Sequence, residues 1–357
     1  MNRMADALKS ALREAKAEVL LITNPVNIRY LTGFTGSNAL LAVFPDHSVF
    51  WTDPRYTLQA AREVGPDARV STKPLLIAAE QYLARRRIRR VGFERENLRF
   101  DQYQILNKRA AALIPISAAV ERLRVVKSAA EIKKIRTAVR TNSAAWESAL
   151  KAVKPGMREA DLAGSIDYRM RRLGAESAAF ETIVAAGERS ALPHSRPGAT
   201  RFTDSQLVLV DMGATQDGYT SDMTRMFHLG APSRKVRQTY SVVHEAQLAA
   251  IAAIRPGITG AAIDKAARDV FEAHGLAEQF VHSTGHGLGL EIHEEPRLGK
   301  KSKTRMQPGM VVTVEPGVYL EGWGGIRIED TVVVTAHGCE VLTPTSKELR
   351  IIHSTVT

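Results

Sequence analysis

Residues 254–258 read Ile-Arg-Pro-Gly-Ile, and a similar stretch, Val-Lys-Pro-Gly-Met, occupies residues 153–157. In each copy the Pro-Gly turn precedes an amphipathic segment with helical spacing. This segment ends at Gly174 in the first copy and at Gly275 in the second. The chain therefore contains an internal repeat, which predicts two similar α/β halves packed around a pseudo-twofold axis.

The repeat continues into two apolar strands that each end in an acidic residue. Asp211 follows the apolar run 207–210, and Glu315 follows the apolar run 311–314. Two halves related by a pseudo-twofold axis would bring these strands together at the centre of the domain. Because a buried carboxylate without a partner is costly, we expect a positive charge beside them.

The first acidic strand is predicted to fold back as a hairpin. Asp217-Gly218 is a strong signal for a two-residue turn, which would pair Gln216 with Tyr219. Strand alternation then makes Asp211 and Asp222 diagonal neighbours on one face, within reach of one cation. The alternative is an exposed pair on a solvated face, but the apolar run before Asp211 argues against it.

A second pair of carboxylates and a histidine-rich segment complete the polar set. Glu315 and Glu329 flank the turn 321–325, and Glu329 lies between Ile328 and the apolar run Val332–Val334. Residues 282–293 read HSTGHGLGLEIH, which includes His286. Taken alone, this segment could instead contain histidines with a purely structural role rather than metal ligands.

Together these residues predict a dinuclear metal centre. Four carboxylates and one imidazole suit two divalent ions of the manganese or cobalt type, and zinc less exclusively. Two such ions about 3.5–4 Å apart clamp a hydroxide and stabilise a tetrahedral intermediate. The five candidate ligands are Asp211, Asp222, His286, Glu315 and Glu329.

The composition is that of a globular protein without a disulfide framework. Cys339 is the single cysteine, no apolar run is long enough to span a membrane, and residues 1–23 lack the apolar centre of a signal peptide. We therefore expect a cytoplasmic protein. The formal charge is +11, with a basic cluster at residues 85–90. Positive charge alone does not provide sequence-specific contacts to nucleic-acid bases. Nucleic-acid binding is not the expected function.

Residues 1–120 are predicted to form a separate α/β domain. Strands are expected near 19–23, 39–44, 49–52, 91–93 and 113–116, and helices near 56–64 and 75–86. The segments 24–27, 33–37 and 52–56 are interpreted as turns. Ser128 and Glu131 form a capping box for a long helix that opens the second domain, residues 121–357.

The motifs resemble those of a known family. DMGA, TSDMTR, HSTGHGLGLEIH, VEPGVY and GIRIED occur in the order found in the M24 "pita-bread" metallopeptidases, within the branch of aminopeptidase P and prolidase. The resemblance covers the whole chain. It implies a pita-bread catalytic domain after a creatinase-type N-terminal domain, and a homodimer.

The resemblance also implies roles for the site residues. Asp222 and Glu329 would bridge two divalent ions, with Mn²⁺ expected and Co²⁺ or Zn²⁺ as alternatives, and Glu315 would act as the general base. His194 would hydrogen-bond the substrate or the oxyanion, and His293 would contact the leaving side of the scissile peptide. The residues implied in substrate binding are His282, Arg327 and Tyr319. Without the family context, His194 could be an ordinary turn residue and Arg327 could pair with a core carboxylate.

The expected function is hydrolysis of the Xaa-Pro bond at the N-terminus of proline-containing peptides by a metallo-aminopeptidase. An Xaa-Pro dipeptidase that acts only on dipeptides is the alternative, and the shorter chain with its compact N-terminal domain favours the aminopeptidase. A creatinase-like member without metal would have lost ligands that are all present here. A non-catalytic binding module of the same fold also predicts degraded ligands.

Overall fold

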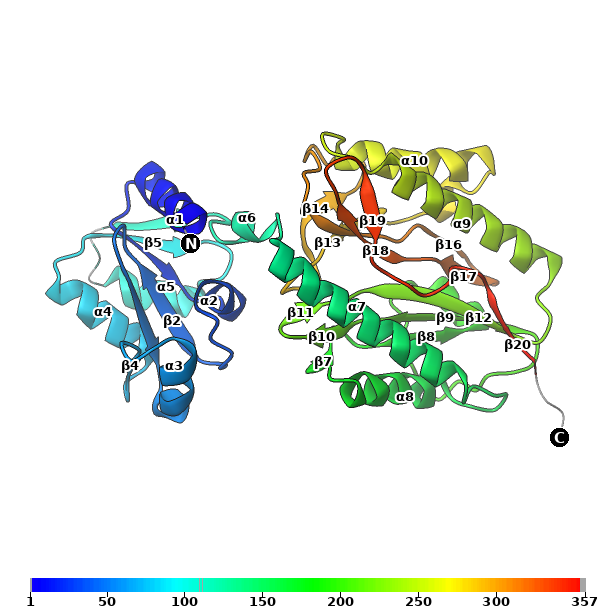
Figure 1. Ribbon diagram of the computed structural model, residues 1–357, viewed down its shortest axis with the longest axis horizontal. Coiled ribbons are helices and arrows are strands. Elements are labelled where there is room, and N and C mark those ends of the chain that lie inside the picture. Colours follow the sequence, from blue (N-terminus) through cyan, green and yellow to red (C-terminus); the bar gives the residue numbers. More distant parts are fainter. Residues whose placement is uncertain (1, 109, 111, 354–357) are drawn as a thin grey trace. The chain divides into compact units, whose positions relative to one another are not determined.

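A computed structural model describes residues 2–108, 110 and 112–353 (Figure 1). The chain folds into two compact units, Met1–Arg124 and Val125–Thr357.

The N-terminal unit is built on one mixed sheet. Its strands are β1 (Val19–Ile22), β2 (Ala39–Val43), β3 (Ser48–Thr52), β4 (Arg69–Val70), β5 (Arg90–Glu94) and β6 (Ala112–Ile116), in the spatial order β4-β3-β2-β1-β5-β6. Its helices are α1 (Asn2–Ala15), α2 (Pro25–Thr32), η1 (Pro54–Tyr56), α3 (Thr57–Glu63), α4 (Leu75–Arg85), α5 (Phe100–Asn107) and α6 (Glu121–Arg124). The β1–β2 and β2–β3 pairs are antiparallel, whereas β1–β5 and β5–β6 are parallel.

Successive residues of the central strand β1 enter opposite faces of this sheet. Val19 and Leu21 pack into one apolar cluster with α4, and Leu20 and Ile22 pack into another with α1 and α2. The strands predicted here are confirmed. The interpretation of 24–27 as a turn is wrong: Asn24 caps α2 by accepting a hydrogen bond from the backbone of Val26, and Pro25 occupies the first turn.

The second unit places its strands between two pairs of helices (Figure 1). The first half comprises α7 (Ala129–Leu150), α8 (Glu159–Arg172), β7 (Ser177–Ala178), β8 (Ile183–Ala186), η2 (Gly187–Ala191), β9 (Gln206–Met212), β10 (Ala214–Gln216), β11 (Tyr219–Thr220) and β12 (Met223–Leu229). The predicted capping box at the start of α7 is present, because the side chain of Ser128 accepts from the Glu131 backbone and Glu131 accepts in return.

The second half repeats this plan. It comprises α9 (Arg234–Ala253), α10 (Gly260–Ala273), η3 (Ala277–Gln279), β13 (Gly285–Gly287), β14 (Glu294–Leu298), β15 (Val311–Val314), β16 (Gly317–Leu320), β17 (Gly324–Arg327), β18 (Asp330–Val334) and β19 (Cys339–Val341). The final strand, β20 (Arg350–Ile352), returns to pair with β12 of the first half. The two larger sheets run β20-β12-β9-β8 and β14-β13-β15-β18-β19.

The predicted repeat is visible as matching contacts in the two halves. The N–H of Gly156 donates to the carbonyl of Phe202, and in the second half the N–H of Gly257 donates to the carbonyl of Met306. The guanidinium of Arg201 binds the carbonyl of Gly156, and that of Arg305 binds the carbonyl of Gly257. The two Pro-Gly turns are therefore held in the same way.

The hairpin predicted around Asp217-Gly218 forms with the expected register. Gln216 pairs with Tyr219, and both turn residues have positive φ, as a type I′ turn requires. The same register continues along β9 and β12, where Asp211 lies opposite Thr224. Asp222 is therefore the diagonal neighbour of Asp211, as predicted.

Among the described residues, no helix combines the length and the apolar character needed to cross a membrane.

Candidate metal centre and substrate cavity

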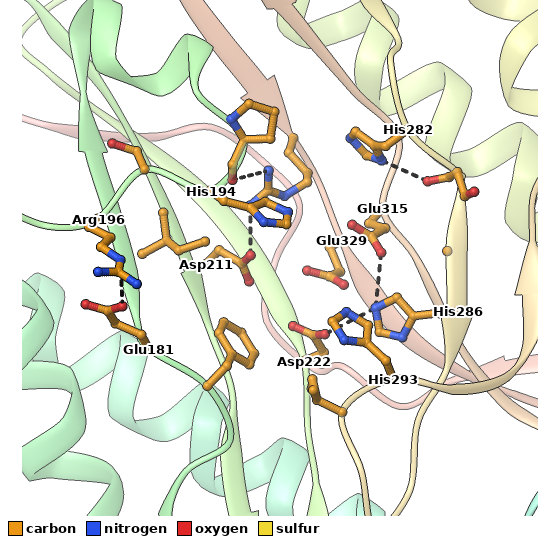
Figure 2. A pocket seen from close by; sticks show the side chains of 18 of the residues that line it. Glu181, His194, Arg196, Asp211, Asp222, His282, His286, His293, Glu315 and Glu329 are labelled. Carbon is orange, nitrogen blue, oxygen red and sulfur yellow. Dashed lines mark hydrogen bonds and ion pairs between the residues drawn. The ribbon is translucent and has the colours of Figure 1, made fainter. Parts of the chain in front are cut away.

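The two halves of the second unit enclose one cavity of about 500 Å³. Strand ends carry its carboxylates: β9 supplies Asp211, and the residues before β12, after β15 and before β18 supply Asp222, Glu315 and Glu329. Most predicted site residues line this space, namely His194, Asp211, Asp222, His282, His286, His293, Glu315, Arg327 and Glu329. The structure thus brings together side chains that are far apart in the sequence (Figure 2).

The candidate metal ligands converge on a small volume. One ligand atom each from Asp222, His286 and Glu329 lies within 4.8 Å of the others. His286 Nε2 lies 3.3 Å from Glu315 Oε1 and 3.7 Å from Asp222 Oδ2. Its other ring nitrogen, Nδ1, is 3.0 Å from the carbonyl of Gly287 and donates to it. This bond leaves Nε2 as the nitrogen able to bind a metal.

The strand that carries His286 approaches its neighbour very closely. A Cβ atom at Gly285 would overlap the backbone carbonyl of Thr313 on β15. Glycine at this position therefore lets β13 lie close enough to direct His286 toward Glu315.

The electrostatics of the carboxylates show why a cation belongs here. Burial raises the pKa of Asp222 well above its usual value, and the charges of Glu329, Asp211 and Glu315 raise it further. Burial also raises the pKa of Glu329 well above its usual value, with help from Glu315 and Asp211. Burial acts in the same direction on Glu315, but the hydrogen bond and charge of His286 outweigh it and hold the pKa of Glu315 at about 2.

Asp211 provides a direct test of whether the donors fit a metal. Its Oδ2 accepts a hydrogen bond of 2.7 Å from Arg327 Nη2. Its Oδ1 is buried and has no hydrogen-bond partner among the described residues. A buried carboxylate oxygen without a partner is costly unless a cation binds it. The donor set therefore fits divalent ions.

Three further histidines surround these ligands, and two of them make contacts that define their state. His282 Nδ1 donates to the Ser283 carbonyl, and its Nε2 lies 2.9 Å from the hydroxyl of Tyr319. The ring of His293 lies edge-on to that of His286, with the centroids 4.4 Å apart. Partial desolvation lowers the pKa of both, that of His293 to about 4 with help from the charges of His286 and Arg297, although the residue His293 remains exposed to the cavity. The third, His194, is exposed on the cavity wall.

Arg327 is committed to protein partners. Its guanidinium binds Asp211, the Tyr319 hydroxyl at 2.7 Å and Thr224 Oγ1 at 2.9 Å, and the residue is only 3% exposed. The structure therefore shows the pairing with a carboxylate that the sequence left as an alternative. Tyr319 does not line the cavity, and its hydroxyl links Arg327 to His282.

Sequence reasoning missed several residues of the site. Thr224 Oγ1 donates to Glu329 Oε2 at 2.8 Å, and Thr313 Oγ1 donates to Glu315 Oε1 at 3.2 Å. Both had a signal: Thr224 is the cross-strand partner of Asp211, and Thr313 shares a strand face with Glu315. The cation Arg297 and the apolar wall residues Phe180, Ile183 and Ile292 had none.

Comparisons with known proteins agree with this geometry. Residues 133–336 match the profile of metallopeptidase family M24, and residues 4–126 match that of the Creatinase/Prolidase N-terminal domain. The Xaa-Pro dipeptidase of Pyrococcus furiosus is 34% identical over 98% of this chain and 100% of its own length. The Xaa-Pro dipeptidase of Lactobacillus helveticus is 35% identical over 97% and 98%.

Two solved structures extend the agreement to the backbone. The Xaa-Pro dipeptidase from Bacillus anthracis is 39% identical, with a TM-score of 0.95 over 98% of this chain and 99% of that one. The X-Pro aminopeptidase from Thermotoga maritima is 33% identical, with a TM-score of 0.90 over 96% and 100%. The predicted order, a creatinase-type domain followed by a pita-bread catalytic domain, is confirmed. The chain belongs to metallopeptidase family M24.

Proposed function

We propose that this enzyme is an Xaa-Pro dipeptidase that uses two divalent metal ions, with Mn²⁺ as the expected metal. Membership of family M24 implies divalent ions, and the unpartnered oxygen of Asp211 supports their binding at this site. The relatives named Xaa-Pro dipeptidases support this function better than the aminopeptidase that the sequence favoured.

The Xaa-Pro bond explains why such a site is needed. Its nitrogen carries no hydrogen and the ring fixes φ, so recognition through a backbone N–H at that position is impossible. Bound divalent ions would polarise the scissile carbonyl and lower the pKa of a water molecule. Glu315 would accept the proton of that water, and the histidines at the rim would orient the peptide. Phe180, Ile183 and Ile292 provide apolar walls for a pyrrolidine ring.

The observation that carries the choice of a dipeptide is the cation of Arg297. This side chain lines the cavity, and its guanidinium has no hydrogen-bond or ion-pair partner among the described residues. Its backbone pairs with His286 across β13 and β14, and its N–H donates to the carboxylate of Glu295. A dipeptide ends in a carboxylate directly after proline, which a free guanidinium can bind through two hydrogen bonds.

An Xaa-Pro aminopeptidase is the second candidate. A neighbouring cavity of about 970 Å³ shares His282, Ser283 and Arg297 with the first and would give room to residues beyond proline. The similarity to the Thermotoga maritima X-Pro aminopeptidase also favours it.

Product analysis with three substrates separates the two candidates. The Mn²⁺-loaded protein is incubated with Ala-Pro, with Ala-Pro amide and with Ala-Pro-Ala-Ala, and released alanine is measured. A dipeptidase cleaves Ala-Pro and loses at least tenfold in kcat/KM when the carboxylate is replaced by an amide. In Arg297→Gln the two dipeptide substrates should become similar. Efficient release of alanine from the tetrapeptide would identify the aminopeptidase.

Failure to cleave any of these peptides with Mn²⁺, Co²⁺ or Zn²⁺ would contradict both candidates and favour a binding function. The domain boundary near residue 120, the homodimer and the cytoplasmic location stay predictions. Light scattering after size-exclusion chromatography tests the dimer.

A further inference from the structure

Each of the three outer histidines lies on a segment that is tied down by an ion pair with a buried carboxylate. The pairs are Glu159–Arg189, Asp264–Arg268 and Glu294–Lys127. The side chains of these acids are 0%, 1% and 6% exposed. All three pairs lie within the second unit, and none of their members is a candidate metal ligand.

The first pair holds the segment of His194 at both ends. Glu159, the first residue of α8, accepts hydrogen bonds from the backbone of Ala186 at 2.9 Å and of Gly198 at 3.1 Å. Arg189 binds Glu159. It also donates to Ser195 Oγ at 3.0 Å and to the backbone carbonyl of Arg196 at 2.7 Å. These contacts hold the chain before and after His194, and none of them involves its ring.

The second pair holds the segment of His282 from α10. Arg268 donates from Nε to Asp264 at 2.7 Å and from Nη2 to the carbonyl of His282 itself at 2.6 Å. Asp264 also accepts from the backbone and the hydroxyl of Thr284. Because Arg268 also donates from Nη1 to the carbonyl of Phe280 at 3.1 Å, the backbone on both sides of His282 is fixed to one helix.

The third pair acts on the segment of His293. Glu294 follows this histidine directly, and its Oε2 lies 3.1 Å from Lys127 Nζ. Its Oε1 accepts from the backbone of Glu291 at 3.1 Å, which closes the loop that presents His293 to His286. Lys127 lies just before α7, and its side chain is 1% exposed.

All three acids are buried, and in the Glu294–Lys127 pair the cation is buried as well, whereas the side chains of Arg189 and Arg268 are 38% and 19% exposed. Taking a charge out of water is expensive, and the attraction within such a pair often does no more than offset that cost. What such a pair does provide is a fixed direction and distance, because it is satisfied in only one arrangement. Three such pairs, one beside each outer histidine, therefore point to a shared purpose.

We propose that Glu159–Arg189, Asp264–Arg268 and Glu294–Lys127 are positioning pairs, each of which fixes one outer histidine in the wall of the cavity that contains the candidate metal ligands. This inference rests on the proposed function for the part played by the histidines in catalysis, but the fixing of each segment can be measured without activity.

Hydrogen-exchange mass spectrometry on the full chain tests the fixing. Glu159→Gln, Asp264→Asn and Lys127→Met each remove one charge, and each should speed amide exchange in its own segment: 187–198, 280–285 or 288–298. Arg136→Met, which breaks the surface pair of Arg136 with Glu340 on the outside of α7, is the matched control and should change none of them. Exchange that rises equally in all three segments, or in none, would overturn the proposal.

Kinetics of Ala-Pro hydrolysis test the purpose. Lys127→Met should lower kcat at least tenfold with little change in KM, in the range seen when groups that orient catalytic residues are removed. In the His293→Gln background the same substitution should cost almost nothing, because the histidine it positions is gone. If Lys127→Met lowers kcat by the same factor in both backgrounds, its role is a general structural one and the proposal is overturned.

Two further variants keep the test decisive. Lys127→Met leaves Glu294 buried without its cation, so Glu294→Gln, which retains an acceptor for the backbone of Glu291, serves if the first variant does not fold. The double variant Lys127→Met, Glu294→Gln removes both charges and keeps the acceptor for the backbone of Glu291, so it should regain the melting temperature but not kcat. Recovery of both would contradict a positioning role. If the wild-type protein fails to cleave Ala-Pro, the proposed function falls, while the exchange data still decide whether the segments are fixed.

Discussion

Arg327 Nη2 lies 2.7 Å from Asp211 Oδ2, whereas Asp211 Oδ1 is buried without a hydrogen-bond partner among the described residues. A carboxylate with one oxygen held by a buried guanidinium cannot rotate freely. Its second oxygen therefore has a fixed direction before any cation arrives. The same guanidinium binds Thr224 and Tyr319, so one side chain organises several parts of the site.

Replacing Arg327 by methionine should weaken metal binding. The substitution frees Asp211 to rotate. It also removes a positive charge, which by itself would favour a cation, so the expected loss comes from the orientation of Asp211. Loss of groups that orient metal ligands typically costs 10–100-fold in affinity, and we expect a decrease in that range. Competition with a fluorescent chelator measures the affinity for Mn²⁺. Arg136→Met, on the surface of α7, is the control, and equal affinities in the two variants would contradict this role.

The stabilisation that Mn²⁺ gives should increase with pH. Asp222 and Glu329 have pKa values raised by burial and by neighbouring carboxylates. The stability that such groups contribute is complete below their unfolded pKa values of about 4 and is lost as pH rises through the folded values. Protons thus stabilise the metal-free site at low pH, and cations replace them at higher pH.

The measurement is the melting temperature with EDTA and with MnCl₂ at pH 5, 6, 7 and 8. The difference between the two conditions should grow across this series. Glu329→Gln removes one of the carboxylates for which protons and Mn²⁺ compete. In this variant the difference in melting temperature should therefore depend less on pH. A difference that stays constant in the wild-type protein would show that proton release from these carboxylates does not accompany metal binding.

The part of the site that the sequence predicts is the part built from local patterns. Asp217-Gly218 sets a turn, strand alternation places Asp211 and Asp222 on one face, and the structure has that register. Glu315 and Glu329 could be recognised because each interrupts or ends an apolar run, where a carboxylate needs a partner.

Long-range side-chain pairing has no comparable local pattern. Nothing around Lys127 indicates that its ammonium group meets Glu294, which lies far along the chain. The commitment of Arg327 to Asp211 also depends on how two strands of different halves come together. In the N-terminal unit, Asn24-Pro25 is a recognisable helix start, but the helix that follows is too short for periodicity to reveal it.

The N-terminal unit offers a separate prediction on pH and stability. Hydrogen bonds from Arg55 and Asn38 lower the pKa of Asp53. For an acid with a lowered pKa, the stability it contributes is present above its unfolded pKa, about 3.9, and is lost as pH falls through the folded value. Asp53→Asn keeps an acceptor for the backbone of Arg55 but removes the charge and the second acceptor oxygen, which binds Asn38 and the Arg55 guanidinium.

Calorimetric melting of the wild-type protein and Asp53→Asn between pH 3 and pH 8 tests this sign. The variant should melt at a lower temperature between pH 5 and pH 8, and the difference should begin to shrink between pH 4 and pH 3, where the loss starts. A difference that is independent of pH would mean that the charge of Asp53 does not contribute to stability and that only the hydrogen-bond geometry matters.

Thr224→Val should separate the contribution of the hydroxyl hydrogen bonds of this residue from that of its side-chain packing. Thr224 is fully buried, donates to Glu329 and accepts from Arg327, and valine has nearly the same volume. The substitution leaves a buried donor and a buried acceptor unpaired, which typically costs about 1–3 kcal/mol. If this cost falls on the geometry of Glu329, kcat/KM for Ala-Pro should drop by about tenfold, since 1.4 kcal/mol corresponds to a factor of ten. Thr137→Val on α7, whose hydroxyl binds only the backbone of its own helix, is the matched control and should leave kcat/KM unchanged. A lower melting temperature with unchanged kcat/KM would place the role of Thr224 in folding and leave the alignment of Glu329 to Arg225, which donates to its backbone carbonyl.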